Sequence, residues 1–135
     1  EAQWFGDLKS GRGTMSVGSG VFSGPFSFIS RFEKSGDTNP EELLGAAHAG
    51  CFSMALSGEL GKAGMTAERI ETVAHVTMEP VDGKPTVTKS HLVLKARIPG
   101  ADRARFMEAA NGAKAGCPIT RLLKAEITLE ATLEG

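Results

Sequence analysis

The chain has 135 residues, and its 15 basic and 16 acidic side chains give a formal net charge of −1. This length suits one domain with its own hydrophobic core, so we expect a single domain over residues 1–135. The balanced charge argues against nucleic acid or an anionic membrane as a partner. No stretch approaches the roughly 20 apolar residues of a membrane span, and the first residues lack a secretory pattern, so we expect a cytoplasmic protein.

The first third of the chain is rich in glycine and contains short apolar runs. The segments "QWFGD", "GTMSV" and "GVFSG", followed by the alternating "FSFISRF", predict short antiparallel strands joined by glycine turns. On this pattern Phe26 and Phe28 lie on the strand that leads to Arg31. Trp4 is interpreted as an anchor of its strand rather than as a substrate contact.

A long helix is predicted over residues 40–62. Asn39 can cap it, Pro40 suits its first position, and Glu41 complements the positive end of its dipole. We expect its buried stripe to follow the positions that recur at three and four, and the many small residues of this helix allow close approach of another backbone. The stripe comprises Leu43, Leu44, Ala47, Cys51, Met54 and Ala55.

The remaining chain alternates between strands and helices. Two strands around a turn at 81–85 are followed by a helix over 101–116, a short helix that begins at Pro118, and a final strand over 126–134. The fold class is therefore α+β.

The two cysteines, Cys51 and Cys117, are 66 positions apart and neither belongs to a CxxC pair. In a reducing compartment they are either a redox pair or two buried, unreactive thiols. Cys51 lies too deep in its helix to benefit from the dipole. Cys117 directly precedes Pro118 at a helix start, where the dipole favours a thiolate.

The motifs "TNPEELLGAAHAGCFSMAL" and "AGCPITRLLKAEITL", with "SRFE" and "AQWFGDLKSGRGT" upstream, resemble the OsmC/Ohr family of thiol-dependent organic hydroperoxide reductases, and most closely its OsmC branch. The resemblance implies antiparallel sheets packed on two long central helices, in an intertwined homodimer with active sites at the subunit interface. It also implies a cofactor-free peroxidase of oxidative and osmotic stress defence, with a dithiol reductant such as a lipoylated protein. The implied site consists of peroxidatic Cys51, resolving Cys117, and the supporting residues Arg31 and Glu41.

These implied roles have a physical rationale and raise a geometric problem. Arg31 would stabilise the Cys51 thiolate, and Glu41 would hold the guanidinium through a bidentate pair. Ten helical residues separate Glu41 from Cys51, which is about 15 Å along the axis. Either the helix breaks near Gly45, or Glu41 is mobile, or two chains build each site. We favour two chains, and we predict that Arg31 or Glu41 comes from the partner chain.

Other residues near the cysteines allow more than one interpretation. His48, one turn before Cys51, could act as a base, but a structural histidine bonded to a backbone group is the preferred interpretation, and too few ligands are present for zinc. His75 and His91 fit surface or cross-strand positions. Apolar residues near the two cysteines and Arg31 could line a substrate pocket, although each fits an ordinary core better. They are Phe26, Phe28, Phe52, Met54, Leu56, Ile119, Leu122 and Leu123.

An alternative function is a non-catalytic homodimeric module that binds a small apolar ligand and uses the cysteines for packing. The joint presence of Cys51, Cys117, Arg31 and Glu41 favours the peroxidase, because a packing role does not require that set. A redox sensor would need an output surface, which the balanced charge does not provide.

Overall fold

The computed structural model describes residues 1–33 and 35–135. Its contacts group into two compact units, Glu1–Leu43 and Leu44–Gly135, and each unit has its own three-stranded sheet. Helices and sheets together confirm the predicted α+β class. The single domain over 1–135 stays a prediction.

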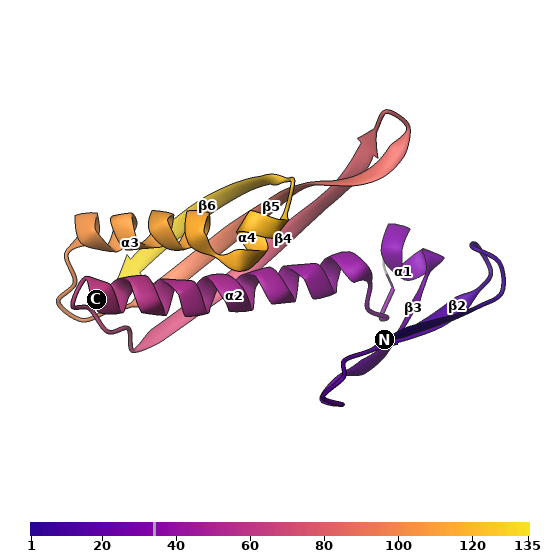
Figure 1. Ribbon diagram of the computed structural model, residues 1–135, viewed down its shortest axis with the longest axis horizontal. Coiled ribbons are helices and arrows are strands. Elements are labelled where there is room, and N and C mark those ends of the chain that lie inside the picture. Colours follow the sequence, from indigo (N-terminus) through magenta and orange to yellow (C-terminus); the bar gives the residue numbers. More distant parts are fainter. Residues whose placement is uncertain (34) are drawn as a thin grey trace. The chain divides into compact units, whose positions relative to one another are not determined.

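The first unit is built on an antiparallel sheet in the order β1 (Ala2–Phe5), β2 (Arg12–Ser16) and β3 (Ser23–Ser27) (Figure 1). In its register Gly13 lies opposite Trp4 on one side and opposite Phe26 on the other. A Cβ at Gly13 would come within 2.5 Å of the Phe26 ring, so this position needs glycine. The predicted short antiparallel strands are confirmed.

The alternating segment after Pro25 does not continue as a strand. The chain turns at Ser27 into the one-turn helix α1 (Phe28–Phe32). Ser27 accepts a hydrogen bond from the backbone of Ser30, and the Ser30 hydroxyl accepts one from the backbone of Ser27. This capping box satisfies backbone N–H groups that a strand would pair with a neighbouring strand. It therefore favours a helix here, although the alternating sequence pattern predicts a strand. Arg31 therefore lies on a helix, and the expectation of a strand at Phe28 was wrong.

The second unit contains the predicted hairpin of β4 (Arg69–Val81) and β5 (Lys84–Arg97). Asp82 and Gly83 have positive φ angles of 51° and 75°, which suits the tight turn between twisted antiparallel strands. The last strand, β6 (Glu126–Glu134), pairs with β5 in parallel. The expectation of wholly antiparallel sheets was therefore wrong for this pair, because the chain between β5 and β6 crosses over through two helices.

The three predicted helices are confirmed as α2 (Pro40–Lys62), α3 (Arg103–Gly116) and α4 (Pro118–Leu122). Within the second unit α2 and α3 run side by side over one face of the sheet β4-β5-β6 (Figure 1). The core between these layers is formed mainly by α2, α3 and β5. Its largest fully buried apolar side chains are Phe52, Leu56, Leu60, Leu92, Leu94 and Phe106.

The buried stripe of α2 differs from the predicted one. Gly45, His48, Phe52, Leu56 and Leu60 are buried, whereas Met54 is 79% exposed. The stripe is rotated because His48, a polar residue that apolar periodicity passes over, finds hydrogen-bond partners in the interior. Cys51 lies beside this stripe and is half-buried.

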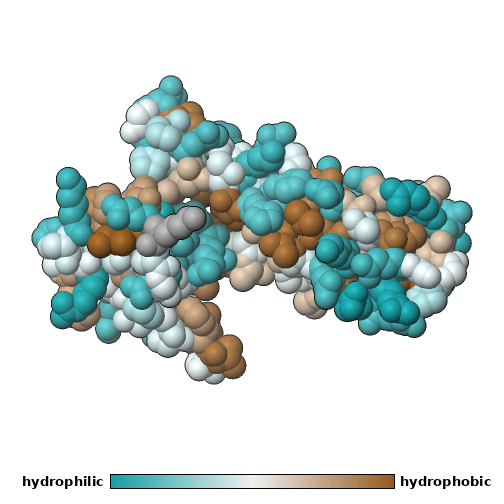
Figure 2. Space-filling view, turned by 180° about the vertical axis from the view of Figure 1, so that it is seen from behind, coloured by the Kyte–Doolittle hydropathy of each residue, from teal (hydrophilic) through white to brown (hydrophobic). Residues whose placement is uncertain are grey.

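Apolar side chains remain exposed in both units. Figure 2 shows apolar groups among the hydrophilic ones at the surface. Among the described residues no helix is long and apolar enough to cross a membrane. The exposed apolar residues include Phe5, Leu8 and Val21 in the first unit and Met54, Val73 and Leu122 in the second.

Candidate active site

The second unit brings the two cysteines together. Cys51 lies on α2, and Cys117 is the fully buried residue between the end of α3 and the start of α4. Both thiols are free, Cys51 packs against the core cluster that contains Cys117, and the Cys117 side chain helps to raise the pKa of the Cys51 thiol. Residues that are 66 positions apart in the chain are therefore in contact in the reduced state.

The surroundings of Cys51 favour its protonated form within this unit. Burial raises the pKa of the Cys51 thiol, and the adjacent Cys117 thiol acts in the same direction, whereas a hydrogen bond from the backbone N–H of Ile119 lowers it. Ile119 belongs to the first turn of α4, and Cys117 makes no side-chain capping bond there. A free N–H at the start of α4 is thus directed at Cys51 rather than at Cys117.

Arg31 and Glu41 meet within the first unit. The guanidinium donates from Nη2 and Nε to Glu41 Oε1, at 2.8 and 3.1 Å. Both bonds end on one oxygen, so the expected bidentate pair was wrong in its geometry. The second oxygen, Oε2, is buried, and none of the described residues donates a hydrogen bond to it.

Asn39 links the two helices that carry this ion pair. Its Oδ1 accepts from the backbone N–H of Glu42 at 2.8 Å, which confirms the predicted cap. Its Nδ2 donates to the carbonyl of Ser30 at 3.0 Å, so the residue also ties the start of α2 to α1. The sequence pattern had indicated only the cap, because the second bond depends on the unexpected helix α1.

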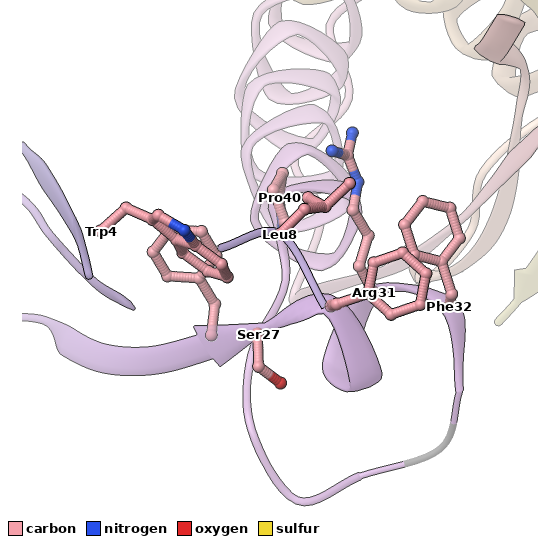
Figure 3. A pocket seen from close by; sticks show the side chains of 8 residues that line it. Trp4, Leu8, Ser27, Arg31, Phe32 and Pro40 are labelled. Carbon is pink, nitrogen blue, oxygen red and sulfur yellow. The ribbon is translucent and has the colours of Figure 1, made fainter. Parts of the chain in front are cut away.

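The first unit also contains an apolar cavity of about 300 Å³ beside Arg31 (Figure 3). Trp4 packs on Phe26 with ring centroids 5.4 Å apart, and both rings line the cavity. Trp4 is therefore more than the strand anchor that we expected. The other lining residues are Leu8, Ser27, Phe28, Arg31, Phe32 and Pro40.

The other apolar candidates have different positions. Phe52 and Leu56 belong to the core, and Ile119 packs against it. Met54 and Leu122 are 79% and 73% exposed, so neither is a core residue. Of the predicted pocket walls, only Phe26 and Phe28 line the cavity beside Arg31.

The structure tests whether helix α2 breaks between Glu41 and Cys51. Helix α2 is continuous from Pro40 to Lys62, so it does not break near Gly45. Arg31 and Glu41 are paired within one chain, so if a partner chain supplies one of these residues it supplies both.

His48 is a structural histidine with partners other than the expected ones. Its Nδ1 lies 2.7 Å from Ser90 Oγ, and its Nε2 lies 2.9 Å from Thr120 Oγ1, so side-chain hydroxyls replace the expected backbone group. Burial lowers its pKa, which favours the neutral ring. His75 and His91 are cross-strand neighbours on β4 and β5, as expected.

Comparison with known proteins decides the family. Residues 33–132 match the family described as OsmC-like protein. The chain belongs to the OsmC-like family. It is 50% identical to Peroxiredoxin OsmC of Escherichia coli (strain K12), over 99% of this chain and 94% of that protein. This similarity supports a peroxiredoxin-type redox function for the OsmC-like chain, as the resemblance implied.

Solved structures confirm the OsmC-like fold. An OsmC-like protein from Mycoplasma pneumoniae superposes with a TM-score of 0.76 at 14% identity, covering 100% of this chain and 96% of that chain. The organic hydroperoxide resistance protein OhrB of Bacillus subtilis gives a TM-score of 0.69 at 20% identity, covering 99% and 96%. At these identities the two comparisons show the fold alone.

Proposed function

We propose that this OsmC-like chain is a two-cysteine peroxidase that reduces organic hydroperoxides to alcohols. The Cys51 thiolate attacks one peroxide oxygen, the O–O bond breaks, and the alcohol leaves with a proton while Cys51 becomes a sulfenic acid. Cys117 then condenses with the sulfenic acid, which forms the Cys51–Cys117 disulfide and releases water. An external dithiol reduces the disulfide.

The proximity of the two thiols carries this proposal. A resolving thiol must reach the sulfenic sulfur before a second peroxide does, and a partner already in contact needs little movement to do so. Two cysteines used only for core packing could lie anywhere in the interior. Their contact supports the redox pair over the packing interpretation.

The cavity of the first unit supports an organic substrate. Aromatic and aliphatic side chains line it, and the Arg31 guanidinium is the charged group on its wall. Such a wall suits the alkyl or aryl part of a hydroperoxide, while the guanidinium can donate to the peroxide oxygens. Hydrogen peroxide has no apolar part to bury there, so we expect it to be the poorer substrate.

A homodimer completes the proposed site. Burial disfavours the Cys51 thiolate within its own unit, so a cation beside the thiol would favour reaction. Arg31 is the proposed cation, and Glu41 is its ion-pair partner. We propose that the Arg31–Glu41 pair of one protomer serves Cys51 of the other.

The reductant in this proposal is a dithiol, such as the lipoyl group of a protein, acting in the reducing cytoplasm. A dithiol suits a buried disulfide because its second thiol completes the exchange within the mixed intermediate. Cys117 is fully buried and Cys51 is half-buried, so the reductant is expected to attack Cys51 first.

The test is to mix the reduced protein with one equivalent of an alkyl hydroperoxide, in parallel with hydrogen peroxide, and to follow free thiols and intact mass. The proposal expects rapid loss of both thiols and of two hydrogen atoms in mass, faster with the organic peroxide. The Cys51→Ser variant should be inactive, and Cys117→Ser should stop after one turnover unless a small thiol resolves it. Full activity of Cys51→Ser would overturn the mechanism.

The second candidate function is a module that binds a small apolar ligand, which the cavity beside Arg31 also favours. In the same experiment this alternative predicts that both thiols survive for minutes. A fluorescent apolar probe, followed through Trp4 on the cavity wall, would then bind with the cysteines unchanged.

A further inference from the structure

His48 links the two segments that carry the cysteines. It lies three residues before Cys51 on α2, and Thr120 lies three residues after Cys117 on α4. His48 Nε2 and Thr120 Oγ1 are 2.9 Å apart. Their hydrogen bond therefore joins the same two segments as the contact between the thiols. On each segment the bonded residue lies three positions from the cysteine.

The imidazole is held from both ends. Nδ1 lies 2.7 Å from the hydroxyl of Ser90 on β5, and both His48 and Ser90 are fully buried. A neutral imidazole offers one donor and one acceptor, and two hydroxyls can match either arrangement. Because both nitrogens are engaged, the ring has no free position to take a proton from Cys51.

The segment that His48 anchors has few other anchors. Helix α4 has five residues, and none of them is buried. A helix of this length has little stability of its own. The Ile119 side chain packs against the core, and the Thr120 hydroxyl is held by His48. Loss of the second contact would let the chain after Cys117 move.

We propose that His48 is a positioning residue for the resolving step, holding α4 against α2 through Thr120 so that the Cys117 thiol stays beside Cys51. In this step the Cys117 sulfur attacks the Cys51 sulfenic sulfur, the S–O bond breaks, the S–S bond forms, and one water leaves with the thiol proton. The inference rests on the proposed peroxidase for its role in the cycle. The positioning itself concerns the two thiols whether or not a peroxide oxidises them.

The test compares two Thr→Val substitutions that each remove one partly buried hydrogen bond of α2. Thr120→Val removes the bond between His48 and α4. Thr72→Val is the matched control, because Thr72 Oγ1 lies 2.8 Å from Ser53 Oγ and ties α2 to β4 instead. Thr120→Ser keeps the hydroxyl and is the rescue variant.

The first readout is the equilibrium of the Cys51–Cys117 disulfide with dithiothreitol, which measures the effective concentration of the two thiols. Thr120→Val should lower this concentration about fivefold, as loss of one hydrogen bond implies, while Thr72→Val and Thr120→Ser stay within about twofold of the wild type. The second readout is intact mass after an organic hydroperoxide. Thr120→Val should then leave more Cys51 as sulfenic and sulfinic acid.

Two results would overturn the inference: an unchanged effective concentration in folded Thr120→Val, or an equal loss in Thr72→Val. If Thr120→Val does not fold, Thr120→Ala takes its place, because the site is only partly buried and tolerates a smaller side chain. If the wild-type thiols do not react with hydroperoxides, the proposed function is wrong. The equilibrium of the Cys51–Cys117 disulfide with dithiothreitol still tests the role of His48.

Discussion

The backbone N–H of Ile119 lies beside the thiol of Cys51 and lowers its pKa. The start of α4 thus serves the cysteine on another helix, although Cys117 is the residue that precedes it in the chain. This contact opposes the effects of burial and of the neighbouring thiol on Cys51. The reactivity of Cys51 therefore depends on where the Cys117 segment lies.

Removing the second thiol should make Cys51 more acidic. The Cys117 side chain raises the pKa of Cys51, so Cys117→Ala should shift the Cys51 pKa downward. The measurement is the rate of alkylation of the Cys51 peptide against pH, with the midpoint moving to lower pH in the variant. Cys117→Ser, which can still hydrogen-bond, should shift the midpoint less. An upward shift in Cys117→Ala would contradict the contact described above.

The Arg31–Glu41 pair can be tested with two neighbouring glutamates. Glu41→Gln should lower kcat/KM for an organic hydroperoxide by roughly tenfold, because a neutral amide holds the guanidinium less firmly. Glu42→Gln is the control, since Glu42 accepts from Thr38 rather than from Arg31. The control should stay within about twofold of the wild type. Equal losses in both variants would indicate a general effect on the start of α2.

Stability should fall in acid because of His48. Burial lowers the folded-state pKa of His48, so the unfolded chain takes up the proton first. This contribution is complete above the unfolded pKa of about 6.5 and is lost as the pH falls from there through the folded pKa. Urea unfolding between pH 8 and pH 5 should show a steeper loss for the wild type than for His48→Gln. Parallel profiles would exclude this linkage.

The aromatic cavity depends on the absence of a side chain at Gly13. A Cβ there would come within 2.5 Å of the Phe26 ring and of the Gln3 carbonyl. Gly13→Ala should therefore destabilise the protein by about 1–3 kcal/mol and raise KM for an aryl hydroperoxide. Gly18→Ala is the control, because a Cβ at Gly18 meets no atom within 4 Å. Urea unfolding and KM separate the two effects.

Local signals in the sequence account for much of the fold. The Asn39 cap and Pro40 mark the start of α2 because capping depends on a few adjacent residues. The turn at Asp82–Gly83 was predictable for the same reason. The parallel pairing of β6 was not, because it depends on a crossover rather than on the strand's own residues. Helix α1 was missed because its capping box competes with a pattern that also suits a strand.

The candidate site likewise contains features that the sequence predicts and features that it does not. The four residues named from the motifs form two pairs in the structure, Cys51 with Cys117 and Arg31 with Glu41. The tie between His48 and Thr120 had no local signal, because its partners are 72 positions apart. Trp4 was interpreted from its strand alone, whereas its place on the cavity wall depends on two further strands.

The contact between two cysteines so distant in the chain also affects how the molecule resists unfolding. A disulfide that closes a loop of this length restricts the unfolded chain and adds about 4 kcal/mol in the chain-entropy description. The thiols already meet in the reduced fold, so forming the bond requires little rearrangement. During the catalytic cycle the protein would alternate between an oxidised form that is more stable to unfolding and a reduced form that is less stable. Resistance to proteolysis would then report the fraction of molecules in the oxidised, disulfide-bonded form.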